Sequence, residues 1–343
     1  FANTQLGWER SSQTDVGLDL AAFNNKFTFT AEYYNRITSD MLLSIQLPAI
    51  SGFTSSLGNV GKVRNRGVEL AAGYRTKMGP VGVWSNFNIS FNRNKVLAIR
   101  GVNDEIWNGD FYDDYNVSKV GRPIGMIYGY KVLGIFRNQQ EINKSPTQDG
   151  AIPGVYKYAD ADSNGVISYD TKDMVEIGNP WPKGTWALSL GADYKHFDLT
   201  VLLTGAYGYD MMAQIQKSTM NMDGVFNVLT VSKDRFRSEQ NPGNGIYATT
   251  NTWKWERESN SRYIYNASHV WLKNVSVGYT FQKVPLFRLT NMRLFVSADN
   301  LILFTNYPGS NPDANNKGGT NPGFDDVAYP VSRTFTAGLR VSL

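Results

Sequence analysis

The sequence predicts an all-β fold, in which antiparallel strands cross a membrane and long loops join them on one side. Three observations support this prediction. Apolar and polar residues alternate along most of the chain, and tight turns alternate with long loops. No uninterrupted apolar run is longer than that of Leu301–Phe304. A helix needs roughly 20 apolar residues to span a bilayer, so helical insertion is excluded.

The alternation defines the strands. Apolar side chains occupy every second position in the clearest segments, which are 27–33, 68–74, 186–194 and 335–343. A period of two gives each strand one apolar and one polar face. About ten strands are predicted in the 343 residues. They lie near 13–22, 26–44, 60–77, 81–98, 125–137, 184–196, 196–209, 268–282, 291–304 and 331–343.

The connections between these strands fall into two classes. Tight turns are predicted at 23–26, 77–80 and 195–196. Long loops rich in Asn, Asp, Gly and Pro are predicted near 99–124, 138–183, 210–267 and 305–330. Outer-membrane barrels show this asymmetry, with short periplasmic turns and long extracellular loops. A helix is expected inside the third loop, within 210–238.

Strand length separates a membrane barrel from a soluble sandwich. Sandwich strands run to about 5–6 residues, whereas many of these reach the roughly 9–11 residues of a tilted membrane strand. Aromatic residues also gather near strand ends, as at Tyr74, Tyr194 and Phe197, where a barrel carries its interfacial girdle. The pattern favours a membrane barrel and leaves the sandwich as the alternative.

Several motifs follow one another in the order found in a known family. The first are Leu6–Glu9, Gln13–Asp19, Glu32–Arg36 and Asn59–Glu69. The later ones are Tyr128–Lys131, Ile177–Pro180, Trp271–Val275, Val296–Leu301 and Arg333–Leu339. Over nearly its whole length, the sequence resembles the C-terminal half of the SusC/RagA-type TonB-dependent transporters of the bacterial outer membrane.

This resemblance implies a barrel of about 22 strands around an N-terminal plug, with 1–343 as the C-terminal part of the barrel. It implies import of nutrient oligosaccharides or peptides, energised through the TonB complex, beneath a SusD-like lipoprotein that acts as a lid. The plug and the other strands are expected to come from elsewhere in a longer transporter. A partial barrel alone would expose two strand edges, which outer-membrane lipid does not tolerate.

One loop has the pattern of a calcium site. Asp160, Asp162 and Asn164 present oxygen ligands at alternate positions, as in a D-x-[DN]-x-[DN]-G loop. The twelfth position is Thr171 rather than a bidentate Glu. The carboxylates nearest to this position are Asp170 and Asp173. The loop is either a Ca²⁺ site, the one cofactor that the sequence suggests, or an Asx-turn loop held by its own hydrogen bonds.

Catalysis and nucleic-acid binding find little support. The chain has two histidines, His196 and His269, no cysteine, and no G-x-S-x-G, H-E-x-x-H or P-loop motif. The acids of the pairs Asp113–Asp114 and Asp325–Asp326 are adjacent, which would point them to opposite faces of a strand. The net charge is +4 without a cluster of Lys or Arg. We expect neither an enzyme nor a nucleic-acid-binding protein.

Aromatic side chains make the loops a candidate binding surface. They are Trp107, Phe111, Tyr112 and Tyr115, which accompany Asp110 in one loop, and Trp181, Trp253, Trp255, Tyr263 and Tyr265 in others. Such rings stack on sugars or grip peptides, or else pack the loops together. No single residue is assigned to substrate. Two further classes therefore stay open: a soluble all-β carbohydrate-binding or adhesin module, and a passive porin.

Overall fold

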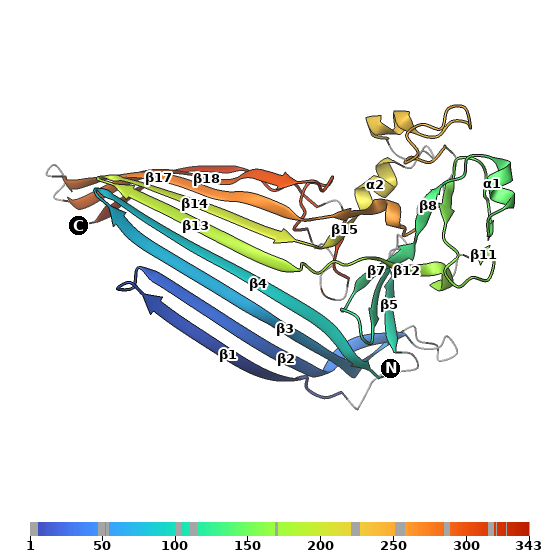
Figure 1. Ribbon diagram of the computed structural model, residues 1–343, viewed down its shortest axis with the longest axis horizontal. Helices are drawn as coiled ribbons and strands as arrows, with labels where there is room; N and C mark the ends of the chain where they lie inside the picture. The colour runs from blue at the N-terminus through green and yellow to red at the C-terminus, as the bar shows by residue number, and fades with distance from the viewer. Residues whose placement is uncertain are drawn as a thin grey trace.

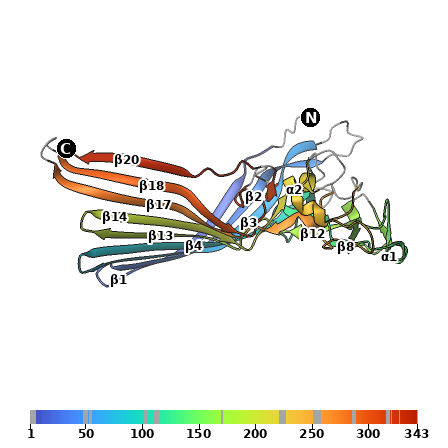
Figure 2. The ribbon, with the colours of Figure 1, turned by 90° about the horizontal axis from the view of Figure 1, so that it is seen from above.

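A nine-stranded antiparallel sheet forms one curved wall (Figures 1 and 2). The computed structural model describes residues 6–46, 52, 55–100, 104–109, 115–168, 171–220, 227–250, 258–284, 289–314, 319, 321–326 and 328–342. In order across the wall, the strands are β1 (Arg10–Ala22), β2 (Phe27–Gln46), β3 (Ser55–Met78), β4 (Val81–Ile99), β13 (Gly184–Tyr194), β14 (Phe197–Tyr207), β17 (His269–Val284), β18 (Leu289–Thr305) and β20 (Thr334–Ser342).

The register places the alternating apolar residues of neighbouring strands on one face, called here the outer face. Val16, Tyr33, Val68 and Phe91 form one row, each directly opposite the next. Val16 is 65% exposed and Tyr33 is 45% exposed, as expected of a surface that meets lipid. The predicted alternation is confirmed. The sandwich alternative is wrong, because in the described part of the chain no second sheet packs on this face.

Tight turns close one end of the wall. The turn between β1 and β2 contains Asn24 and Asn25, with φ angles of 56° and 62°. The turn between β3 and β4 uses Gly79 at φ 61°, and the one between β13 and β14 uses Lys195 at φ 54°. Asn and Gly tolerate this left-handed region best. All three turns lie where the sequence predicts them. Outer-membrane barrels place such short turns in the periplasm, so this end of the wall is called here the periplasmic end.

The long connections fold into a loop layer at the other end of the wall (Figure 1). A four-stranded sheet joins β12 (Met174–Gly178), β7 (Met126–Tyr130), β6 (Tyr115–Lys119) and β5 (Glu105–Gly109). A three-stranded sheet joins β16 (Ile264–Asn266), β15 (Asp210–Ala213) and β19 (Phe324–Asp325). The smaller pairs are β8 (Val132–Ile135) with β10 (Tyr156–Tyr158), and β9 (Thr147–Gln148) with β11 (Val166–Ile167).

The buried core lies mostly in this loop layer, and one further cluster, around Val63 and Val96, lies where the layer meets the loop end of the wall. One cluster contains Tyr130, Tyr158 and Met174, and another contains Met212 and Phe324. The wall is a single sheet whose outer face is apolar, so its side chains find few protein partners there. Only segments that fold over one another in the loop layer can bury side chains from both sides.

One predicted membrane strand is wrong. Residues 125–137 form two short strands, β7 and β8, which belong to different sheets of the loop layer. Four of the five residues of β7 are buried, so both of its faces pack against protein. A strand buried on both faces shows the same apolar richness as a membrane strand but lacks a lipid side. The wall therefore has nine described strands rather than about ten.

The helix expected within 210–238 is present as α2 (Gln214–Thr219), and a 3₁₀ turn follows at Thr230–Asp234. A second short helix, α1 (Gln139–Asn143), begins after Asn138, whose side chain accepts a hydrogen bond from the amide of Glu141. Among the described residues, no helix is long and apolar enough to cross a membrane.

Candidate functional site

Asn116 joins two distant loops at the centre of the loop layer. Its side chain is fully buried, and Nδ2 donates to the carbonyl oxygens of Gly125 at 2.7 Å and Pro322 at 3.0 Å. Pro322 lies 206 residues further along the chain. A buried carbonyl without a partner is costly, so this one amide fixes the two segments to each other.

The described loop aromatics mostly pack within the layer. Trp107 lies edge-on to Tyr115 and Tyr128, with ring centroids 5.9 and 5.4 Å apart. Its Nε1 donates to Glu105 at 3.0 Å, and this hydrogen bond lowers the pKa of the carboxyl group. Trp107 and Tyr115 therefore make the contacts that the packing alternative expects.

The other described loop aromatics also make contacts within the protein. Trp181 donates from Nε1 to the carbonyl of Ile124 at 2.6 Å, Tyr263 is only 1% exposed, and the hydroxyl of Tyr265 donates to Gln216. Several predicted loop residues lie outside the described residues: Asp110, Phe111, Tyr112, Asp113, Asp114, Trp253 and Trp255.

The two histidines occupy opposite ends of the wall. His196 is exposed in the periplasmic turn, where its ring lies 5.6 Å from that of Tyr279. His269 begins β17 at the loop end and is buried, with Nε2 at 3.1 Å from Asp313 Oδ1. Asp313 also accepts from Nε1 of Trp271 at 3.1 Å. The second histidine thus ties a loop to the rim of the wall.

The acidic pair Asp325–Asp326 does not form a dyad of free carboxylates. Asp325 is 2% exposed, and it accepts hydrogen bonds from the hydroxyl of Tyr307 at 2.9 Å and the amide of Ala328 at 3.0 Å. Burial and the charge of Asp325 raise the pKa of Tyr307. This arrangement holds the loop around 307–328 in place.

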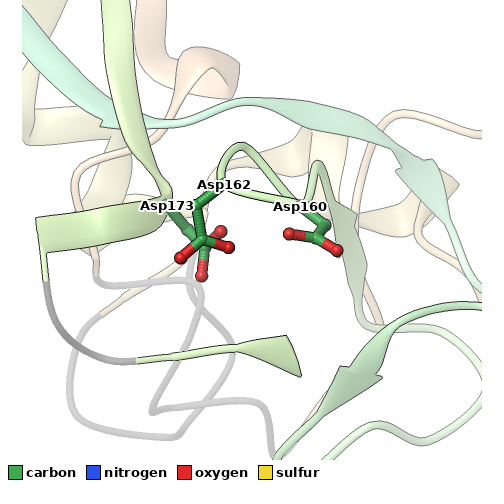
Figure 3. Close-up of side chains that lie close together, drawn as sticks. All are labelled: Asp160, Asp162 and Asp173. Carbon is green, nitrogen blue, oxygen red and sulfur yellow. The ribbon is translucent and has the colours of Figure 1, made fainter. Parts of the chain in front are cut away.

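The Asp160 loop brings three carboxylates together (Figure 3). Ligand oxygens of Asp160, Asp162 and Asp173 all lie within 4.8 Å of one another. Asp173 occupies the region where a Ca²⁺ loop places its closing acid, whereas Asp170 lies outside the described residues. Asn164 turns its Oδ1 to the amide of Val166 at 2.7 Å, so it serves the turn in this structure.

The same carboxylates also accept backbone hydrogen bonds. Asp160 accepts from the amide of Gly165 at 2.8 Å and Asp162 from that of Asn164 at 3.0 Å. Asp173 is fully buried and accepts from the amides of Ala161 and Ser168, each at 3.0 Å. Each carboxylate has spare lone pairs, so the three oxygen-donor groups fit a hard cation such as Ca²⁺. The backbone hydrogen bonds also account for an ordered loop without a bound ion.

The inner face of the wall is polar. At its periplasmic end, the guanidinium of Arg293 on β18 forms an ion pair with Asp198 on β14, across the intervening strand β17. Towards the loop end, Asn65 Oδ1 accepts from Nδ2 of Asn92 at 3.2 Å and of Asn94 at 2.9 Å. This face therefore suits water, a polar solute or a polar protein segment inside a barrel.

Comparison with known proteins identifies the family. The family model described as "TonB dependent receptor-like, beta-barrel" matches residues 1–301. The chain belongs to the TonB-dependent receptor family. Among its relatives, TonB-dependent receptor P3 of Formosa agariphila is 32% identical over 99% of this chain and 35% of that protein. TonB-dependent receptor SusC of Bacteroides thetaiotaomicron is 23% identical over 98% of this chain and 32% of that protein.

Solved structures of this family share the fold. A structure titled "Structure of the RagAB peptide transporter" superimposes with a TM-score of 0.82 at 23% identity, over 99% of this chain and 36% of that chain. The chain thus spans about a third of the length of the relatives that it matches. The family places the wall in the bacterial outer membrane, with its outer face against lipid and its tight turns in the periplasm.

Sequence reasoning missed the residues that hold the loop layer together. Asn116 and Asp313 belong to no recognisable motif, because each finds its partner through the fold. Asp173 carried a weak signal as an acid just beyond the Asp160 loop. The sequence shows no run of basic residues, and Arg64, Lys95 and their neighbours come together on the outer face only through the register of β3 and β4.

Proposed function

We propose that the protein to which this wall belongs imports nutrient oligosaccharides or peptides across the outer membrane, powered through the TonB complex. The main support for this proposal is the architecture of the wall, a single sheet with an apolar lipid-facing side and a polar inner side. A packed loop layer folds over one end of this sheet. Such a wall can line a solute path while the loop layer shapes its mouth. Membership of the TonB-dependent receptor family supports energised transport rather than a passive porin.

The proposed transporter also needs the remaining strands of the barrel and a plug. β1 and β20 stand at the two ends of the strand order, so each has one edge without a partner strand in the described sheet. Hydrocarbon cannot hydrogen-bond to such edges. We propose that further strands of the same transporter pair with them and that its plug contacts the inner face.

A SusD-like surface lipoprotein is the proposed lid. Exposed apolar side chains gather on segments of the loop layer: Leu133 is 58% exposed, Ile152 is 46% exposed and Ile246 is 45% exposed. A cavity of about 780 Å³ opens beside them, and its lining combines Leu133 and Phe236 with the charged side chains of Arg137 and Glu239. Exposed apolar residues rimmed by charge are typical of protein contact surfaces.

Uptake measurements test the proposal. A strain that lacks the gene should lose uptake of one labelled oligosaccharide or peptide mixture, and the intact gene should restore it. Removal of TonB should abolish uptake to the same degree. Uptake that persists without TonB would favour a passive porin, and unchanged uptake in the gene deletion would remove the import proposal.

We also propose that Ca²⁺ binds the Asp160 loop, through Asp160, Asp162 and Asp173. Support comes from the mutual approach of these carboxylates and from their position in a D-x-[DN]-x-[DN]-G pattern. The bound ion would brace the loop between β10 and β12 and have no role in the transport chemistry.

A further inference from the structure

Four basic side chains form a cluster on the outer face of the wall. Arg66 of β3 lies directly opposite Arg93 of β4. Arg64 lies opposite Lys95 two positions further towards the loop end. Like charges directly opposite each other destabilise an antiparallel pair. None of the four has an ion-pair partner among the residues that the structure describes, and Nε of Arg64 is buried there without a hydrogen-bond partner. Within the described part of the chain, the cluster therefore lacks a counter-anion.

The register shows that the cluster faces outward. The row that contains Arg66 and Arg93 adjoins the row that contains Tyr33, Val68 and Phe91, two positions along each strand. Side chains two positions apart share a face. Tyr33 and Val68 are among the exposed apolar residues of the outer face. The basic cluster is thus a continuation of the lipid-facing surface rather than of the inner face.

The height of the cluster matches the membrane surface. Arg66 lies 12 residues before Met78, which ends β3 at the periplasmic turn. At about 3.3 Å per residue and a tilt of 35–45°, this distance is about 30 Å across the membrane. That is roughly the thickness of the hydrocarbon core. Because the tight turns lie in the periplasm, the cluster lies at the headgroup level of the outer leaflet.

A pocket is already formed at this place. Its volume is about 250 Å³, and its lining includes Arg66 and Arg93 together with Tyr33, Val68 and Phe91. Two guanidinium groups can grip a phosphate through paired hydrogen bonds. The aromatic and aliphatic part of the lining borders the apolar band, where the acyl chains of the same molecule would lie.

We propose that Arg64, Arg66, Arg93 and Lys95 bind the phosphorylated headgroup of an outer-leaflet lipid. The headgroup phosphate neutralises the facing cations, and the attached apolar chains cover Tyr33, Val68 and Phe91. This lipid belongs to the outer surface of the wall, so it is distinct from any solute that passes along the inner face.

Native mass spectrometry of the full-length transporter in detergent tests the site, with lipid A as the probe. We expect Arg66→Gln/Arg93→Gln to raise the dissociation constant for lipid A about tenfold or more. Arg66→Lys/Arg93→Lys keeps the charge and should retain most of the binding. The matched control is Arg75→Gln/Arg340→Gln, which removes two arginines from the inner face at the periplasmic end and should bind lipid A as the wild type does.

Two further probes separate a lipid from a free anion. Dephosphorylated lipid A should bind the wild type as weakly as lipid A binds the double Gln variant. Inorganic phosphate in large molar excess should not displace lipid A. Unchanged lipid A binding in the double Gln variant, equal loss in the control, or full displacement by phosphate would each overturn the proposal. Lys95→Gln, expected to weaken binding several-fold, provides the test if the double variant does not fold.

Discussion

His269 Nε2 lies 3.1 Å from Asp313 Oδ1, so that a side chain at the start of β17 holds a loop more than 40 residues away. The imidazole is buried, and its other nitrogen lies 3.2 Å from the hydroxyl of Tyr209 and 3.1 Å from the carbonyl oxygen of Ala267. Tyr209 in turn donates to the carbonyl of Pro312 at 2.8 Å. Two neighbouring residues of the 305–330 loop are therefore fixed to the rim of the wall.

This contact should depend on pH. Burial lowers the pKa of His269, but the hydrogen bond and charge of Asp313 outweigh it, so the net pKa is raised from 6.5. Its stabilising contribution is complete below pH 6.5 and is lost as the pH rises through the raised value. Burial raises the pKa of Asp313, but His269 outweighs this effect and the net pKa is lowered from 3.8. That contribution is present above pH 3.8 and is lost as the pH falls through the lowered value.

Hydrogen exchange of the full-length protein measures the effect. Protection of peptides that cover 306–313 should be greatest between pH 3.8 and 6.5 and should fall at higher pH, after correction for the intrinsic exchange rate. Half of the Asp313 side chain is exposed, so water screens the pair and we expect about 1 kcal/mol or less. Asp313→Asn should flatten the profile. A wild-type profile that is already flat would contradict the coupling.

Gly191 should not tolerate a larger side chain. A Cβ at this position of β13 would lie 2.1 Å from the indole of Trp84 on the neighbouring strand. We expect Gly191→Ala to destabilise the barrel by about 1–3 kcal/mol, because the indole must leave its place. Thermal unfolding of the full-length protein measures the loss.

Gly17→Ala is the matched control for this variant. Its Cβ would meet only the carbonyl oxygen of Ala31 at 3.9 Å, an ordinary contact, so stability should change little. Trp84→Leu combined with Gly191→Ala should recover part of the loss, since the indole is gone. Equal unfolding temperatures for Gly191→Ala and wild type would show that the Trp84 side chain can move aside without destabilising the protein.

The wall could be predicted from sequence because one face of each strand has lipid as its partner. Every second residue then reports on the same environment, as in the row that contains Tyr33 and Val68. The loop layer gave no such periodic signal. Tyr130 and Tyr158 are buried by segments that are distant in sequence, and β7 is buried on both faces. Alternation therefore could not separate β7 from a membrane strand.

The candidate sites follow the same division. The Asp160 loop could be found because its acids are local in sequence, while Asp173 is added by a short 3₁₀ turn at Thr171–Asp173. The basic cluster could not be found, because Arg66 and Arg93 become neighbours only through the register of β3 and β4. Register depends on pairing between strands, which no single strand records.

Loss of the Asn116 amide should loosen the loop layer. Asn116→Leu leaves the carbonyls of Gly125 and Pro322 without their donor. An unsatisfied buried polar group costs about 1–3 kcal/mol. We expect faster hydrogen exchange in both 115–130 and 321–326, with the wall unchanged. Gln140→Leu, which alters an exposed amide of α1, should leave exchange in these segments at the wild-type rate. Faster exchange confined to 115–130 would show that Asn116 does not join the two loops.

Calcium should stabilise the loop around Asp160. An ion held by Asp160, Asp162 and Asp173 would stabilise the folded loop by about 2.7 kcal/mol at a hundredfold excess over its dissociation constant. Addition of CaCl₂ to the chelator-treated, full-length protein should therefore slow hydrogen exchange in 160–168, and Asp160→Asn/Asp162→Asn should remove this response. Asp104→Asn changes an exposed acid elsewhere in the loop layer and should keep it. If calcium leaves exchange in the wild-type loop unchanged, the hydrogen bonds from Gly165 and Ser168 suffice to order the three carboxylates.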